Sequence, residues 1–222
     1  MAFLGISGMQ YSGEMFAGAR IIVAEDSNVF TSMISKRLKE LFDIEVEICR
    51  SFEDLQVSYD KSSDPITLAI SNINLPGAEN GEALEYLVDL SIPTIVFTGT
   101  FHESMRDKLM AKDIVDYILK DNIFAVDLLA ESICRFLTNH RHHVLIVDDS
   151  ATARALLSSR LKRYNFRVSV AESGGKALEI LKAGGNDFML RPFIDEEFYC
   201  RVNQNLDTLL QIQSMRKERA VA

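Results

Sequence analysis

Cysteine is scarce in this chain of 222 residues, which contains only Cys49, Cys134 and Cys200. They are scattered, odd in number and lack a CxxC spacing, so neither a disulfide framework nor a zinc site is indicated. No stretch approaches the roughly 20 apolar residues that cross a bilayer. Residues 1–19 contain Glu14 and no basic segment ahead of a continuous apolar run, unlike a signal peptide. We therefore expect a protein of the reducing cytoplasm with no membrane span.

Positive charge is also in short supply, with 24 Lys and Arg against 32 Asp and Glu and a formal net charge of −8 at pH 7. Nucleic acids and anionic membranes attract clustered basic residues, so we expect neither as a partner and look instead to proteins. The GxGxxG, P-loop and GxSxG motifs are absent, and a nucleotide-binding or hydrolytic enzyme therefore finds no support. Apolar residues make up 47% of the chain, enough to form hydrophobic cores.

An internal repeat stands out. The segment Ile21–Ser27, with sequence IIVAEDS, returns as VLIVDDS at Val144–Ser150. From Asp26 to Asp149 the offset is 123 residues, which is the length of a domain. In each copy an apolar run gives way to acidic and hydroxyl residues, as where a buried parallel strand ends at a helix N-cap. The sequence therefore predicts two related domains in tandem.

The first copy alternates strand-like runs with segments of helical period, which indicates βα units around a parallel sheet. We expect domains at residues 20–139 and 143–214, after an N-terminal extension over 1–19 and before a C-terminal tail over 215–222. Only four residues, 140–143, then connect the last helix of the first domain to the next strand. The predicted strands of the first copy lie at about 20–25, 45–49, 66–71, 93–98 and 115–119, and its last helix at about 125–138.

The second copy is shorter than the first. It opens with a strand, a helix, a strand at about 167–171 and a helix at about 176–181, and then passes to a fifth-strand pattern at 187–193 and a fifth helix at 196–213. The spacing from Asp26 to Lys120 is 94 residues, whereas that from Asp149 to Arg191 is 42, a deficit of 52. Two βα units, the third and the fourth, are missing. We expect the small remnant to need support from the first domain or from a second chain.

Together these features resemble the receiver domain of two-component response regulators, over about residues 20–213. The resemblance implies an α/β fold with a doubly wound, flavodoxin-like five-stranded parallel sheet of order 2-1-3-4-5, followed by a truncated copy that lacks the third and fourth βα units. In that family an acidic pair and an aspartate after the third strand bind magnesium, and the aspartate takes phosphate from a histidine kinase. A Thr or Ser and a Lys contact the phosphoryl group.

The first copy matches this pattern at four positions and departs from it at the fifth. Glu25 and Asp26 form the acidic pair and are weak candidates for magnesium binding, while Thr98 and Lys120 stand at the phosphoryl-contact positions. Asn72 replaces the aspartate. Because an amide is a poor nucleophile toward phosphorus and carries no charge, we expect no stable acyl phosphate at this site and weakened magnesium binding.

The second copy keeps Asp148 and Asp149 as further weak magnesium candidates, and Arg191 stands where the family has its lysine. Arg is larger than Lys and spreads its charge. The strand that would carry an acceptor is missing, so we expect no working site here. The connector histidines His140, His142 and His143 have no cysteine partner and are better explained as exposed linker residues than as metal ligands.

Two functional hypotheses follow. The first is a pseudo-receiver interaction module, cytoplasmic and homodimeric, that contacts a histidine kinase, an output domain or itself, similar to the regulatory half of receiver-receiver diguanylate cyclases. The alternative is a phosphoryl-accepting response regulator that controls a diguanylate cyclase-type output, in which the deficit in the second copy is not natural. A third possibility stays open, that the matched residues persist only as salt bridges and helix caps.

Overall fold

The computed structural model describes residues 16–99 and 114–180 of the chain. The chain divides into two units after Val170, and each is described by itself. Within the described residues, no helix is both long enough and apolar enough to cross a membrane. The predicted segments 187–193 and 196–213, together with Arg191, lie outside the described residues, as does most of the predicted extension.

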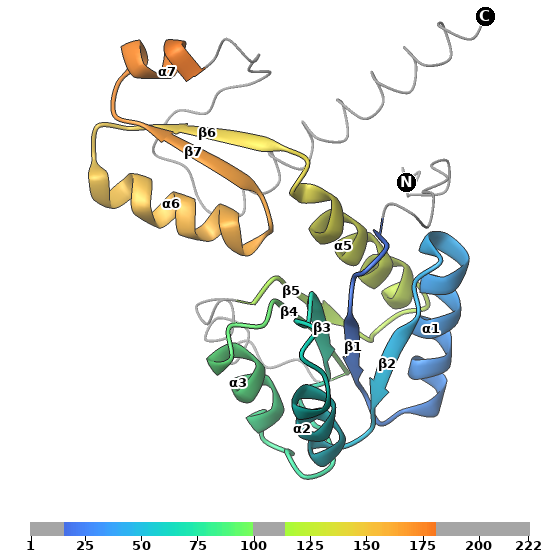
Figure 1. Ribbon diagram of the computed structural model, residues 1–222. Coiled ribbons are helices and arrows are strands. Elements are labelled where there is room, and N and C mark those ends of the chain that lie inside the picture. The colour runs from blue at the N-terminus through green and yellow to red at the C-terminus, as the bar shows by residue number, and fades with distance from the viewer. Residues whose placement is uncertain (1–15, 100–113, 181–222) are drawn as a thin grey trace, which may run out of the picture. The chain divides into compact units, whose positions relative to one another are not determined.

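A five-stranded parallel sheet forms the centre of the first copy (Figure 1). The strand order is β2-β1-β3-β4-β5, which confirms the predicted topology. Since all neighbouring strands pair in parallel, their carboxyl ends meet at a single edge of the sheet. The strands are β1 (Ile21–Ala24), β2 (Val46–Cys49), β3 (Leu68–Ser71), β4 (Thr94–Thr98) and β5 (Asp116–Leu119).

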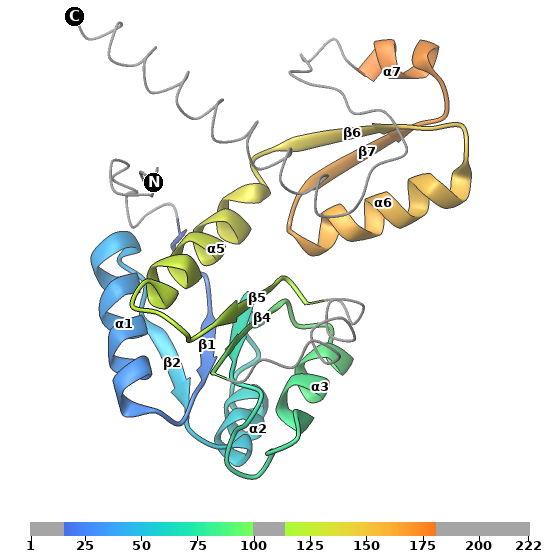
Figure 2. The same ribbon diagram turned by 180° about the vertical axis from the view of Figure 1, so that it is seen from behind.

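Helices cover both faces of this sheet, with α1 and α5 on one face and α2 and α3 on the other (Figures 1 and 2). The side chains of β1 alternate accordingly. Ile21 and Val23 belong to the core beneath α1 and α5, whereas Ile22 and Ala24 belong to the core beneath α2. Burial on both faces explains why the strands read as continuous apolar runs. The helices are α1 (Asn28–Phe42), α2 (Phe52–Lys61), α3 (Glu82–Asp89) and α5 (Ala125–Asn139).

The core of the first copy begins before the predicted domain start at residue 20. Phe16 is buried in the same cluster as β1 and packs edge-to-face on Phe42, with ring centroids 5.4 Å apart. Helix starts are fixed locally. Ser27 caps α1, as its place in the repeat predicted, and Ser51, which was not predicted, forms a capping box with Asp54 at the start of α2.

The second copy begins with a two-stranded sheet of β6 (His143–Val147) and β7 (Arg167–Ala171), with α6 (Ala151–Arg163) between them. Ser150 caps α6 as Ser27 caps α1, so the repeat extends to the local structure. Unlike β1, β6 is only partly covered: Ile146 is buried, while Val147 is 46% exposed. Helix α7 (Gly174–Ile180) follows Val170 and belongs to the next unit. The extent of a truncated second domain over 143–214 stays a prediction.

Candidate functional site

The carboxyl edge of the five-stranded sheet brings the predicted site residues together. Asn72 N–H donates to the carbonyl oxygen of Ala24 at 2.9 Å, and Lys120 N–H donates to that of Thr98 at 2.8 Å. Glu25 directly follows Ala24, so the residues that end β1, β3, β4 and β5 lie along one edge. This placement follows from the parallel register of the strands.

At the centre of this edge lies a buried ion pair between Lys120 and Glu25. The Lys120 Nζ atom donates to Glu25 Oε2, and only 6% and 2% of the two side chains are exposed. The other carboxylate oxygen, Oε1, accepts from the backbone N–H of Ser27 at 3.0 Å. Both oxygens of Glu25 are therefore engaged by groups of the chain itself.

Two phenylalanines complete the surroundings of Lys120. Its Nζ atom lies 4.9 Å from the ring centroid of Phe30 and 5.1 Å from that of Phe97. The rings pack edge-to-face on each other at 5.5 Å. Cations are attracted to the faces of aromatic rings, so this pair holds the ammonium as well as enclosing it. Sequence reasoning missed both residues, although Phe97 directly precedes Thr98 in β4.

The remaining predicted residues occupy different environments. Asn72 is half-buried and brings no charge to the site. Thr98 is fully buried at the end of β4, whereas Asp26 is exposed. Direct side-chain contact is therefore formed by Lys120 and Glu25, and the roles of the other residues toward a phosphoryl group stay predictions.

The donor set does not fit a divalent cation as it is arranged. Mg²⁺ takes oxygen ligands in near-octahedral geometry, usually including carboxylates. Both Glu25 oxygens already have partners, and an amide stands at Asn72. Over residues 16–99 and 114–180, no group of three His, Cys, Asp or Glu side chains gathers as a metal site would require. With Glu25 held by Lys120 and an amide at Asn72, the exposed carboxylate of Asp26 alone makes a weak cation site.

The acidic pair of the second copy, Asp148 and Asp149, forms hydrogen bonds with residues at the start of α6. Asp148 Oδ1 accepts from the backbone N–H of Ser150 at 2.8 Å, and Arg154 Nη1 donates to the carbonyl oxygens of Asp148 and Asp149 at 2.6 and 3.1 Å. Asp149 is exposed. His143, predicted as a connector residue, is the first residue of β6, and its Nε2 atom lies 2.8 Å from Ser169 Oγ of β7.

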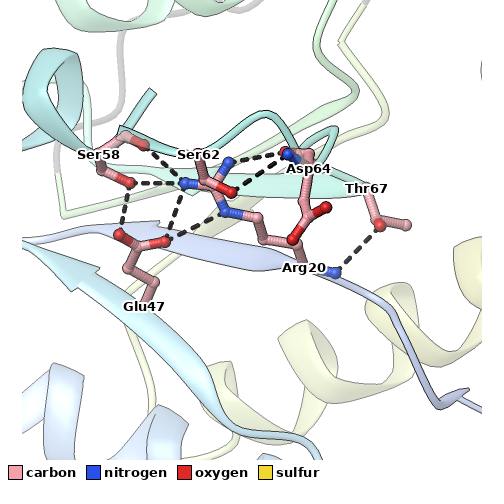
Figure 3. A network of polar contacts seen from close by, with 6 residues as sticks. All are labelled: Arg20, Glu47, Ser58, Ser62, Asp64 and Thr67. Carbon is pink, nitrogen blue, oxygen red and sulfur yellow. Dashed lines mark hydrogen bonds and ion pairs between the residues drawn. The ribbon is translucent and has the colours of Figure 1, made fainter. Parts of the chain in front are cut away.

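A second polar network lies at the opposite, amino-terminal edge of the sheet (Figure 3). The Arg20 guanidinium donates to Glu47 Oε2 at 3.1 and 3.3 Å and to the carbonyl oxygens of Ser58 and Asp64 at 2.7 and 2.9 Å. Its backbone N–H donates to Thr67 Oγ1 at 3.1 Å. Arg20 thus ties β1 to β2, to α2 and to the loop before β3. The sequence did not predict this clamp.

Comparison with known proteins places the chain beside two-component regulators. No protein-family model matches it. It is 46% identical over 48 residues to the two-component response regulator ORR5 of Oryza sativa subsp. japonica, and 44% identical over 48 residues to ORR11 of Oryza sativa subsp. indica. Each match covers 22% of this chain, and 36% and 33% of the respective relatives. The chain therefore matches about a third of the length of these relatives.

Two solved structures, assigned as two-component system response regulator/GGDEF domain proteins, share the fold with TM-scores of 0.74 and 0.73 at 22% identity. Each match covers 86% of this chain and 99% of the other. The first copy thus has the flavodoxin-like fold of receiver domains, and the chain is similar to two-component response regulators. The tandem arrangement of two receiver copies stays a prediction.

Proposed function

We propose that the chain is a two-component signalling regulator whose first copy is a pseudo-receiver, a protein-interaction module that is not phosphorylated at its first site. The observation that carries the proposal is the pairing of Lys120 with Glu25 beside an amide at Asn72. An acyl phosphate requires a carboxylate oxygen as nucleophile, and an amide supplies none.

The charges at the edge support a single resting state. Lys120 is the cation that the receiver resemblance would direct to a phosphoryl group, yet here it neutralises Glu25 inside the protein. Releasing it would leave a buried carboxylate without a partner, which typically costs about 3–5 kcal/mol. The ion pair is therefore neutral with neither a bound cation nor a phosphoryl group. Switching by phosphorylation at this edge lacks an acceptor carboxylate at position 72.

Such a module acts through protein contacts and not through catalysis. The partner classes that fit are a histidine kinase, an output domain or a second copy of the chain in a homodimer, within the cytoplasm. The absence of nucleotide-binding and hydrolase motifs and the similarity to response regulators support this assignment. Magnesium is dispensable for the proposed role, because Lys120 already compensates Glu25.

The proposal is tested by phosphorylating the unmodified chain beside a variant in which the carboxylate is restored. The variant Asn72→Asp, incubated with acetyl phosphate and Mg²⁺, is expected to gain a base-labile phosphoryl adduct by intact-mass spectrometry, while the unmodified chain gains none at this site. Asn74→Asp is the matched control, since it adds the same charge at an exposed position two residues away and should stay unlabelled.

An unlabelled but folded Asn72→Asp variant would show that Glu25, Asp26, Thr98 and Lys120 are kept as an ion pair and strand-end residues. It would leave the pseudo-receiver assignment standing. An adduct on the first copy of the unmodified chain would overturn the assignment.

A second candidate function is a phosphoryl-accepting regulator of a diguanylate cyclase-type output. The observation in its favour is the match to response regulator/GGDEF domain structures over 86% of the chain, about 191 of 222 residues, which extends beyond the first copy. The acceptor would then belong to the second copy. Because this chain lacks the third strand of the second copy, which would carry that acceptor, the candidates are distinguished by peptide mapping of a chain in which the missing βα units are restored. The second candidate requires an adduct in the second copy of that chain.

A further inference from the structure

Charge is strongly segregated along the chain. Residues 140–170 contain six Lys and Arg against two Asp, a net charge of +4 that leaves −12 for the rest of a chain with −8 overall. The same segment contains three of the four histidines. The six basic residues are Arg141, Arg154, Arg160, Lys162, Arg163 and Arg167.

Four of the cationic or titratable groups in this segment gather at the start of the two-stranded sheet. We call His140, Arg141, His142 and Arg167 the connector cluster. Arg167 N–H donates to the carbonyl oxygen of His142 at 3.2 Å, and Arg167 Nη2 lies 3.4 Å from the carbonyl oxygen of Arg141. His140, Arg141 and Arg167 are exposed, and His142 is half-buried. The first residue of β7 thus places its guanidinium beside the connector.

The groups of the cluster act on one another electrostatically. Burial is the main cause that lowers the pKa of His142 from its usual value, and the positive charges of Arg141, His140 and Arg167 lower it further. No carboxylate of the described residues lies within ion-pair distance of Arg141 or Arg167. By contrast, Arg20 pairs with Glu47 at 3.1 Å. Among the described residues, the exposed guanidinium groups of Arg141 and Arg167 therefore have no carboxylate counter-ion.

We propose that the connector cluster is a docking surface for an acidic segment of a partner protein. Guanidinium groups pair with carboxylates through two parallel hydrogen bonds, and an anionic partner would relieve the mutual repulsion of the cluster. A long polyanion fits less well, because the net charge of −12 on the rest of the chain would repel it. A short acidic segment responds mainly to the charges that lie within a Debye length of about 8 Å. This inference is independent of the chemistry at Asn72.

The test uses the full chain and a fluorescein-labelled octaglutamate peptide as the probe, with uncharged octaglutamine as the control. Fluorescence anisotropy is expected to show saturable, salt-sensitive binding of octaglutamate and no binding of octaglutamine. In the double variant Arg141→Gln/Arg167→Gln, affinity for octaglutamate should fall at least about tenfold.

The matched control is Lys36→Gln/Lys61→Gln, which removes two exposed cations from the first copy and changes the net charge equally. Its affinity is expected to stay within about twofold of that of the unmodified chain. Circular dichroism verifies that both double variants fold. Absence of octaglutamate binding, or equal weakening by the two double variants, would overturn the proposal.

Discussion

Lys120 and Glu25, which are 95 residues apart in the sequence, meet at the carboxyl edge of the sheet as a buried ion pair. The pair joins the end of β5 to the end of β1 across the two strands that separate them. It occupies the position where the receiver resemblance leads one to expect a metal ion and a phosphoryl group. Each prediction on the site depends on this contact.

Removing the ammonium should destabilise the fold. Lys120→Met keeps an unbranched side chain of similar length but leaves the buried Glu25 carboxylate without a counter-ion, so we expect the free energy of unfolding to fall by about 3–5 kcal/mol. Urea denaturation followed by circular dichroism measures this change. The double variant Glu25→Gln/Lys120→Met should recover much of the loss, because no buried charge remains. Lys36→Met, at an exposed position, serves as the control, and a Lys120→Met variant as stable as this control would contradict the account.

The clamp at the opposite edge should require arginine. In Arg20→Lys, an ammonium cannot reach Glu47, Ser58 and Asp64 together as the guanidinium fork does. The expected loss of unfolding free energy is about 1.5–3 kcal/mol, the usual value for hydrogen bonds that involve a charged group. Thermal and urea unfolding measure it. Arg50→Lys is the comparison, since Arg50 is exposed and makes one side-chain hydrogen bond, to Asn28. Equal losses in the two variants would argue against the clamp.

Stability should fall on acidification in a way that depends on His142. Burial and the neighbouring cations lower the pKa of His142 in the folded state below 6.5. As the pH falls, the unfolded chain therefore takes up the proton on His142 at a higher pH than the folded chain does. The contribution of neutral His142 to stability is fully present above pH 6.5 and is lost as the pH falls through the lowered pKa. Urea midpoints measured across this range should decline more steeply for the unmodified chain than for His142→Gln. Parallel pH profiles would refute this role.

The sheet could be predicted from sequence because burial on both faces leaves a strong local signal. Every residue of Ile21–Ala24 and of Thr94–Thr98 is buried. The first strand is an unbroken apolar run that is followed by Glu25, and the second has an apolar centre between two threonines. The order of the strands came from the receiver resemblance, not from the runs themselves. Strand β6 is also rich in apolar residues, yet its Val147 is exposed. The composition of a strand therefore does not reveal whether other elements bury it.

The contacts that fix the site could not be predicted, because they join residues distant in sequence. Glu25 and Lys120 were both identified as site residues that face a ligand, and a role in salt bridges was left open without naming which residues pair. Phe30 and Phe97 carried no chemical signal, since an aromatic residue in an apolar strand or helix is typical of a core. Arg20 reads as the polar residue before a strand, and only the fold reveals its partners 27 to 44 residues away.

The central claim is that the first copy accepts no phosphoryl group, and it is tested most directly by intact-mass spectrometry of the unmodified chain of 25.0 kDa. The chain is measured with and without acetyl phosphate and Mg²⁺, and any adduct is mapped by peptide analysis. We predict an unchanged mass for the peptides that contain Asn72, Glu25 and Asp26. An acid-stable, base-labile adduct on any of these peptides would mean that a carboxylate of the first copy accepts phosphate, and the pseudo-receiver account would be wrong.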